Sequence, residues 1–358
     1  MTDHAAFGPR TVLVTGGAGF IGSNLVRWLL QNQGELRLVN LDLLTYAGNL
    51  DSLRGLDSAR HHFVRGDIRD LDLVRRLLRG DGAQTAPVDA VLHLAAESHV
   101  DRSIMGPAAF VETNVMGTLT LLEACRAELA ERARPFRFIQ VSTDEVYGTL
   151  GPNDLPFNEE TPLAPNSPYA ASKAAADLLV RAYVETFALP AIVTRCSNNY
   201  GPYQFPEKLI PLMITRALRD ETLPVYGDGK HVRDWIHVED HARALWSVLT
   251  LGQVGRTYNI GGESETTNNE IVRRVLSALE KPDSLITYVA DRLGHDRRYA
   301  MDISRMRREL DWSPKRQLPE ALAETIAWYL NNRTWWERVL SEAYRAAITL
   351  YLSATHAT

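Results

Sequence analysis

The run Gly16-Gly17-Ala18-Gly19-Phe20-Ile21-Gly22 constrains the fold more than any other feature of the sequence. Residues 11–15 before it predict a β-strand, and residues 20–30 after it predict a helix. A chain that turns this sharply from strand to helix needs positions without a Cβ, and the helix then offers free N–H groups to a phosphate. Gly16, Gly19 and Gly22 therefore predict a dinucleotide-binding turn, although a tight turn without a ligand shows the same spacing.

The pattern of strand and helix continues beyond this turn. Near-continuous apolar strands separated by helices predict an α/β fold, a Rossmann-type doubly wound parallel sheet. Further strands are expected at residues 36–41, 62–64, 88–94, 138–142 and 192–195, and helices at residues 71–78, 108–133, 169–187, 239–249 and 269–279.

The domain organisation follows from where this alternation stops. Residues 10–200 are expected to form the dinucleotide-binding domain, with segments around 230–260 returning to it. Residues 201–340 predict a smaller, mixed C-terminal lobe, because Pro and Gly make residues 198–229 irregular. Residues 341–358 form a C-terminal extension whose role is open.

Acidic and small residues at strand ends indicate which cofactor binds. Asp42 follows Gly22 by 20 residues and ends the second predicted strand, where a carboxylate binds the adenosine ribose and repels a 2′-phosphate. NAD is therefore favoured over NADP, with a helix cap or turn as the alternative for Asp42. Asp67 and Ile68 are placed to hold the adenine, although an ordinary turn explains them almost as well. The small side chains of Leu94-Ala95-Ala96 let a cofactor lie against the backbone.

Two further groups carry reactive side chains. Tyr169 and Lys173 share one face at the start of a predicted helix, and a lysine cation lowers the pKa of a nearby phenol. Thr143-Asp144-Glu145 ends the fifth predicted strand, at the sheet edge where doubly wound folds bind ligands. Two adjacent carboxyl groups offer the acid and the base that elimination of water needs. The alternative for this triplet is a solvated turn.

Composition excludes several classes of function. The net charge of −5 does not suggest binding to nucleic acid or membrane, and no run of 18 apolar residues could span a bilayer. Two cysteines, Cys125 and Cys196, form no zinc motif and fit a cytoplasmic location. His237 and His241 have a spacing that a metal could use, but the sequence defines no third ligand, so a structural role is favoured and no metal is expected.

At these residues the chain resembles the extended short-chain dehydrogenase/reductase family and, within it, the dTDP-glucose 4,6-dehydratases. The resemblance rests on the glycine turn, Asp42, the Thr143–Glu145 triplet and the Tyr169/Lys173 pair, and runs from about residue 11 to about residue 340. Further matching stretches are residues 95–103, 195–202, 206–211, 225–229, 233–238 and 294–299.

The resemblance implies a lyase that binds NAD and converts dTDP-glucose to dTDP-4-keto-6-deoxyglucose in deoxysugar biosynthesis. Tyr169 would take the proton of the 4-hydroxyl as C4 is oxidised, Glu145 would remove the C5 proton, and Asp144 would protonate the departing 6-hydroxyl before hydride returns to C6. Thr143 and Lys173 complete the catalytic set. A homodimer through the helices at 108–133 and 169–187 is also implied.

The resemblance also implies two sets of binding residues. The cofactor set is Gly16, Gly19, Phe20, Ile21, Gly22, Asp42, Thr45, Asp67, Ile68, Leu94, Ala95, Ala96, Thr113, Tyr169, Lys173 and Asn198. The substrate set is Ser98, Thr143, Asn199, Lys208, Leu209, Pro224, Tyr226, Arg233, Asn268, Arg292, His295 and Tyr299.

Alternatives remain at this stage. An NAD-dependent nucleotide-sugar 4-epimerase needs only the cofactor site, Thr143 and Tyr169, whereas a non-catalytic nucleotide-sensing module would be expected to lack Tyr169 or Lys173. The choice between thymine and uracil, and between cell-wall and secondary-metabolite pathways, stays open. Leu293 stands where the family commonly has proline, so the loop around Arg292 and His295 is less restrained than the resemblance implies.

Overall fold

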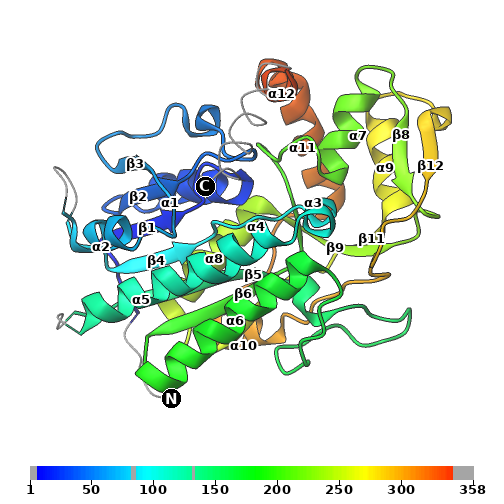
Figure 1. Ribbon diagram of the computed structural model, residues 1–358. Coiled ribbons are helices and arrows are strands. Elements are labelled where there is room, and N and C mark those ends of the chain that lie inside the picture. The colour runs from blue at the N-terminus through cyan, green and yellow to red at the C-terminus, as the bar shows by residue number, and fades with distance from the viewer. Residues whose placement is uncertain (1–5, 82–85, 131–133, 342–358) are drawn as a thin grey trace.

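The computed structural model describes residues 6–81, 86–130 and 134–341. Its centre is a parallel sheet with the strand order β3-β2-β1-β4-β5-β6-β10 (Figure 1). The chain adds β2 and β3 on one side of β1, and then β4, β5, β6 and β10 on the other side. The β1/β4 boundary, where this order reverses, is the topological switch point at which doubly wound sheets bind ligands. The strands are β1 (Thr11–Thr15), β2 (Arg37–Asp42), β3 (His61–Arg65), β4 (Ala90–His93), β5 (Arg137–Thr143), β6 (Ala191–Cys196) and β10 (Thr257–Ile260).

Helices cover both faces of this sheet, which confirms the predicted fold class. On one face Leu25 and Leu245 pack in a core with Val14, and on the other Leu121 and Val180 pack with Leu13. Burial on both faces explains why the strands are apolar at almost every position. The first face carries α1 (Phe20–Asn32), α8 (Val238–Leu251) and α10 (Ser304–Leu310), and the second α2 (Leu71–Arg79), α5 (Gly117–Leu129) and α6 (Pro168–Phe187).

The second lobe, at the right of Figure 1, has its own core of Met213, Val272, Tyr329 and Trp336. Its three-stranded sheet is formed by β7 (Asn198–Tyr200), β9 (Val232–His237) and β11 (Glu265–Thr267), and a separate pair by β8 (Leu223–Tyr226) and β12 (Ile286–Val289). Its helices are α7 (Leu209–Ala217), α9 (Asn268–Ala278), α11 (Leu318–Asn331) and α12 (Arg333–Leu340). The shorter elements of the chain are η1 (Leu50–Leu53), α3 (Val100–Met105), α4 (Ala108–Phe110), η2 (Val111–Met116), η3 (Asp144–Tyr147) and η4 (Asp283–Leu285).

Three segments differ from the sequence prediction. Residues 198–229 are not irregular throughout, because they contain α7 and β8; Pro211 lies in the first turn of α7, where a missing N–H costs little. The helix expected at 108–133 is interrupted by the π-helix η2. Residues 230–260 contribute to both lobes. Strand β9 joins the smaller lobe, whereas β10 pairs in the central sheet and α8 packs against it.

Two observations concern the chain as a whole. Among the helices of the described ranges, none has the length and apolar character needed to cross a membrane. The C-terminal extension expected from residue 341 onward lies outside the described residues apart from Ser341 itself.

Candidate active site

A pocket of about 320 Å³ opens at the carboxyl edge of the central sheet, where β1, β2, β4, β5 and β6 end. Every residue that the sequence assigned to a cofactor lines it, from the glycine turn through Asp42 and Ile68 to Thr113, Lys173 and Asn198. The structure therefore brings the whole predicted set together at the switch point of the sheet.

The glycine turn forms the floor of this pocket and has no room for side chains. Gly16 has a φ of +73°, and a Cβ there would lie 2.7 Å from the backbone of Ala95. A Cβ on Gly22 would lie 2.1 Å from the carbonyl oxygen of Gly16. No side chain caps the start of α1, so the positive end of this helix faces the pocket. These features fit the diphosphate of a dinucleotide.

Asp42 takes part in both of the roles weighed for it. Its carboxylate accepts hydrogen bonds from the backbone N–H groups of Ala18 and Leu44, each at 2.8 Å, and so braces the glycine turn. Burial nevertheless raises the pKa of Asp42, against the effect of these two bonds. Each oxygen keeps a second lone pair, and the side chain lines the pocket, where a ribose hydroxyl fits as donor.

Thr143, Asp144 and Glu145 lie where β5 turns into η3. The Thr143 hydroxyl caps η3 by accepting the N–H of Glu145 at 3.3 Å, and donates to Oδ1 of Asp144 at 3.2 Å. The other oxygen of Asp144 is buried and has no hydrogen-bond partner among the described residues. A buried polar atom without a partner is costly, so this oxygen is suited to a ligand hydroxyl.

The two carboxyl groups of this triplet differ in their surroundings. Burial, reinforced by the charge of Glu145, raises the pKa of Asp144 well above its usual range. Burial also raises the pKa of Glu145, but the cations Lys208, Arg233 and Arg292 oppose that rise. Because cations favour the ionised form, Asp144 is the better suited of the two to act as an acid, and Glu145 to act as a base.

Tyr169 and Lys173 lie on the first turns of α6, whose start is fixed by the Ser167 hydroxyl accepting the Ala170 N–H at 3.1 Å. The prediction that Lys173 lowers the pKa of Tyr169 is wrong for this structure. Burial, then Glu145, holds the pKa of the phenol well above its usual range. The ammonium of Lys173 instead donates to the carbonyl of Val141 at 2.7 Å. These surroundings therefore disfavour ionisation of the phenol.

The predicted substrate residues divide into two groups. Ser98, Thr143, Asn199 and Lys208 line the pocket. Leu209, Pro224, Tyr226, Arg233, Asn268, Arg292, His295 and Tyr299 lie outside its lining, in the smaller lobe and the loop after β12.

The second group is linked to the pocket by its charges. The guanidinium of Arg233 lies 4.4 Å from the ring centre of Tyr299, and that of Arg292 lies 5.4 Å from the ring centre of Tyr226. Arg292 also pairs with Asp101 at 3.1 Å, across the gap between the lobes. The charges of both arginines oppose the raised pKa of Glu145, which links them to the pocket that Glu145 lines.

Asn199 is less available to a ligand than predicted. Its amide donates to the carbonyl of Ser197 at 3.0 Å, and its oxygen meets Nδ1 of His241 at 2.9 Å. His237 caps α8 through its Nδ1, which accepts the N–H of Glu239 at 3.2 Å. Both histidines therefore have the structural role that the sequence favoured.

Several residues that line the pocket were not assigned to the site by the sequence analysis, among them Tyr46, Glu97 and Glu207. The Arg102 guanidinium stacks 3.7 Å from the ring centre of Tyr46 and lies 3.4 Å from the carboxylate of Glu207. Burial raises the pKa values of both Glu97 and Glu207. Glu97 and Glu207 lie within the matching stretches 95–103 and 206–211, but they become neighbours only where the loop after β4 meets the segment before α7.

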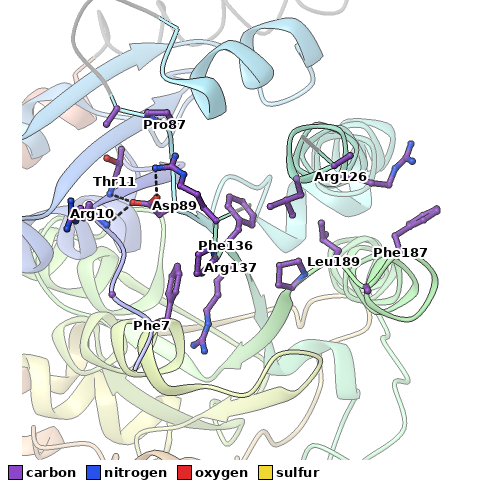
Figure 2. Close-up of a pocket in the computed structure, with 18 of the residues that line it drawn as sticks. Phe7, Arg10, Thr11, Pro87, Asp89, Arg126, Phe136, Arg137, Phe187 and Leu189 are labelled. Carbon is purple, nitrogen blue, oxygen red and sulfur yellow. Dashed lines mark hydrogen bonds and ion pairs between the residues drawn. The ribbon is translucent and has the colours of Figure 1, made fainter. Parts of the chain in front are cut away.

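A larger hollow, of about 1230 Å³, lies at the opposite, amino edge of the sheet (Figure 2). Asp89 there accepts the N–H groups of Arg10 and Thr11 at 2.9 and 3.0 Å. Arg137 donates to the carbonyl of Leu249 at 2.7 Å and lies 5.0 Å from the ring centre of Phe7. None of the predicted site residues lines this amino-edge hollow.

Comparison with known proteins agrees with this geometry. The family model described as GDP-mannose 4,6 dehydratase matches residues 13–325. A dTDP-glucose 4,6-dehydratase of Xanthomonas campestris pv. campestris is 56% identical over 349 residues, which cover 94% of this chain and 97% of that protein. A protein of the same name from Neisseria meningitidis serogroup B is 53% identical, covering 94% and 98% of the two chains.

Solved structures extend this comparison. A dTDP-glucose 4,6-dehydratase of Streptomyces venezuelae with NAD bound is 49% identical, has a TM-score of 0.86, and covers 92% of this chain and 99% of its own. A UDP-glucose 4-epimerase of Thermotoga maritima is more distant at 29% identity, with a TM-score of 0.81 and coverage of 90% and 99%.

Proposed function

The chain belongs to the family described as GDP-mannose 4,6 dehydratase, and from this we propose that its carboxyl-edge pocket is the active site of a dTDP-glucose 4,6-dehydratase. The enzyme is an NAD-dependent hydro-lyase that converts dTDP-glucose to dTDP-4-keto-6-deoxyglucose. The single observation that carries the assignment is the adjacent pair of carboxyl groups, buried Asp144 and partly buried Glu145, that line the same pocket as Tyr169. An epimerase has no use for this pair.

NAD fits the residues present. The glycine turn leaves backbone exposed to a diphosphate, Asp42 is placed for the adenosine ribose, and Lys173 and Tyr169 lie at the other end of the pocket. When bound, NAD accepts hydride from C4 of the sugar, brings a positive ring that favours the phenolate, and gives the hydride back at C6. The proposed cofactor residues are the set expected from the sequence, all of which line the pocket.

Within the protein, each reactive group has one role. Tyr169 takes the proton of the 4-hydroxyl, and the Thr143 hydroxyl holds that sugar hydroxyl in place by a hydrogen bond. The resulting ketone acidifies C5–H, which Glu145 removes while surrounded by Lys208, Arg233 and Arg292. Asp144, which burial keeps protonated, donates its proton to the 6-hydroxyl as water leaves.

The smaller lobe supplies the nucleotide-binding side. Arg233 and Arg292 present guanidinium groups that match a diphosphate, and Tyr226 offers a partly exposed ring against which the base can lie. Lys208 and Ser98 line the same pocket as the catalytic residues, and the Lys208 ammonium donates to the carbonyl of Ser98 at 3.2 Å. We propose that Asn268, His295, Tyr299, Leu209 and Pro224 complete this surface.

Incubation of the enzyme with dTDP-glucose in deuterated water tests the proposal. A 4-keto-6-deoxy product that carries deuterium at C5 is expected, because Glu145 exchanges its proton with solvent. Glu145→Gln should still oxidise C4, with NADH accumulating, but should form no dehydrated product. Appearance of dTDP-galactose without deuterium at C5 would instead show an epimerase. A parallel reaction with UDP-glucose measures the preference for the base.

A homodimer is part of the proposal. Met116, Leu178 and Phe187 expose apolar side chains on the helical layer built from η2, α5 and α6. Burial of this layer against a second copy is expected to yield a dimer in sedimentation velocity, and Leu178→Arg to yield a monomer. Cys125 and Cys196 are buried and form no disulfide in the described part of the chain, which agrees with the cytoplasmic location that we propose.

A further inference from the structure

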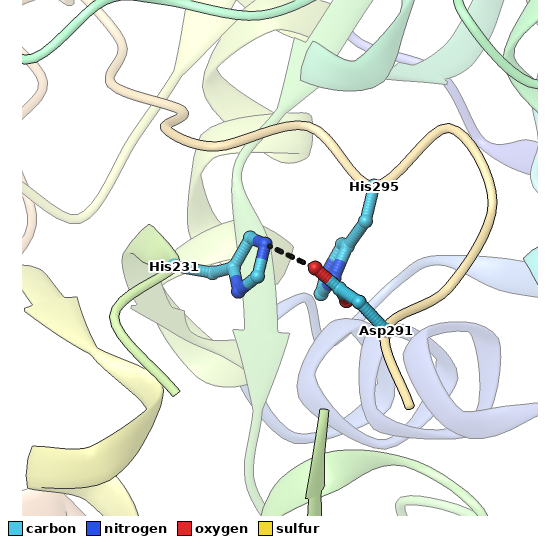
Figure 3. A group of neighbouring side chains, drawn as sticks. All are labelled: His231, Asp291 and His295. Carbon is cyan, nitrogen blue, oxygen red and sulfur yellow. Dashed lines mark hydrogen bonds and ion pairs between the residues drawn. The ribbon is translucent and has the colours of Figure 1, made fainter. Parts of the chain in front are cut away.

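Two groups of interacting charged side chains lie outside the lining of the carboxyl-edge pocket. The first joins His231, Asp291 and His295, with the two imidazole rings stacked 3.7 Å apart (Figure 3). His295 already belongs to the proposed nucleotide-binding surface, so this group adds no separate site. The second group surrounds Arg195 of β6, and none of its members has a role in the proposed mechanism.

Arg195 is a buried cation that contacts two different elements. Its Nε donates to Oδ2 of Asp177, on α6, at 2.9 Å, and its Nη1 donates to the hydroxyl of Tyr147, at the end of η3, also at 2.9 Å. The guanidinium lies 4.8 Å from the ring centre of Tyr147 as well. All three side chains are buried. Because its donors are fixed in one plane, a guanidinium holds two partners in a defined relative position.

The partner on α6 lies beside the residues of the oxidation step. Asp177 follows Lys173 by one turn, so the two side chains share a face of the helix. Both are buried, and the charge of Asp177 opposes the fall that burial causes in the pKa of Lys173. Since Lys173 and Tyr169 act in the proposed oxidation at C4, Arg195 holds the part of α6 that carries this step.

The partner on η3 lies beside the residues of the dehydration step. Tyr147 is the last residue of the short helix that begins with Asp144 and Glu145. Its hydroxyl accepts from Arg195 and donates to Oδ1 of Asn259 at 2.8 Å. Tyr147 therefore fixes η3, and with it the two carboxyl groups proposed to remove water.

We propose that Arg195 is a positioning residue that fixes the oxidation pair of the active site relative to its dehydration pair. The C4 hydroxyl and the C5 hydrogen belong to adjacent carbons of one hexose, so Tyr169 and Glu145 must both reach the same bound ring. A buried ion pair adds little net stability, because desolvation offsets the attraction, so stability alone is a weak reason for this contact. The inference rests on the proposed function and adds to it a residue that lies outside the pocket lining.

Stopped-flow absorbance combined with rapid quenching separates the two steps, because NADH forms as C4 is oxidised and disappears as hydride returns to C6. Tyr147→Phe removes only the hydroxyl on the η3 side. It should slow loss of water about tenfold and leave oxidation within about twofold of the wild type, so that NADH accumulates. Tyr258→Phe is the matched control, since it removes a hydroxyl in the same core that donates to Glu309 at 3.0 Å. This control should follow the wild-type time course.

Asp177→Asn tests the α6 side and should slow oxidation about tenfold without accumulation of NADH. Because both side chains act through Arg195, the double variant should lose less turnover than the product of the two single losses. Arg195→Lys keeps the charge but not the two fixed donors, and should slow both steps.

Equal slowing of the two steps in Tyr147→Phe, or wild-type rates for both, would overturn the role of Arg195. This readout also decides the matter should Asp177→Asn fold poorly. Losses that multiply in the double variant would overturn the role as well. Failure of the proposed function would look different, since the wild type would then form no 4-keto-6-deoxy product.

Discussion

One hollow lies at the amino ends of the strands of the central sheet and another at their carboxyl ends. The smaller of the two contains the reactive side chains. The amino-edge hollow, about 1230 Å³ in volume, has arginines and an aspartate whose hydrogen bonds are used within the protein. The carboxyl-edge pocket, about 320 Å³ in volume, has buried carboxyl groups, a phenol and an oxygen without a partner. Unsatisfied, desolvated groups therefore mark the proposed active site better than volume does.

The largest effect is expected at Tyr169, where the carboxyl-edge pocket acts on the substrate directly. Tyr169→Phe removes the group that accepts the 4-hydroxyl proton, and kcat/KM should fall about 10³-fold. Tyr183→Phe, later on the same helix, is the matched control, since its hydroxyl meets Glu123 at the surface. Comparable turnover by Tyr169→Phe and Tyr183→Phe would contradict a catalytic role for Tyr169.

A second test concerns the proton held by Asp144. Because burial raises the pKa of Asp144, the donor form is present below this raised pKa and is lost as pH rises through it. We expect kcat to decline on that side of its pH profile, and Asp144→Asn to be about 100-fold slower without this decline. Stability follows the same direction: the cost begins above the ordinary aspartate pKa of about 3.9, where the unfolded chain ionises, and grows until the pH reaches the raised pKa. At neutral pH, Asp144→Asn should therefore unfold at a higher temperature than the wild type.

Asp42 should give a smaller, purely binding effect. Asp42→Asn weakens the hydrogen bonds to the adenosine ribose, so the Kd for NAD should rise about tenfold. The Kd for NADP should rise less, because the repulsion of its 2′-phosphate is also removed. Fluorescence titration of both cofactors measures the ratio, and an unchanged ratio would restrict Asp42 to bracing the glycine turn.

The smallest effect on catalysis is expected at the amino-edge hollow. Asp89→Asn weakens the charge-assisted bonds to the N–H groups of Arg10 and Thr11, which should lower the free energy of unfolding by about 1 kcal/mol. Chemical denaturation measures this loss, and steady-state assays should give wild-type kcat and KM. A marked change in either constant would contradict the view that this edge serves stability alone.

Local patterns were enough to predict the dinucleotide-binding half. The glycine turn, Asp42 and the strand ends follow one another in a repeated unit, and their order in the chain fixes their places around the pocket. Asp144 and Glu145 were found for the same reason, since they end a strand of that sheet.

The smaller lobe could not be predicted in the same way. Helix α7 was missed because Pro and Gly surround an apolar segment, and β9 gave no sign that it would leave the central sheet. Glu97, Glu207 and the cluster of His231 with Asp291 and His295 depend on contacts between distant segments, which spacing along the chain does not encode. The error at Tyr169 has an energetic origin: burial, with the nearby charge of Glu145, raises the pKa of the phenol, and spacing along the chain shows neither.

Strand β10 is synthesised after the other strands of the central sheet, and this order has a consequence for folding during translation. This strand, Thr257–Ile260, covers β6 at the edge of the central sheet, although about 60 residues separate the two along the chain. A nascent chain that ends near residue 200 therefore presents β6 as an open edge, with backbone groups free to pair with another chain. Fragments that end at this length should aggregate. The central sheet is completed only after the ribosome has added the first part of the smaller lobe.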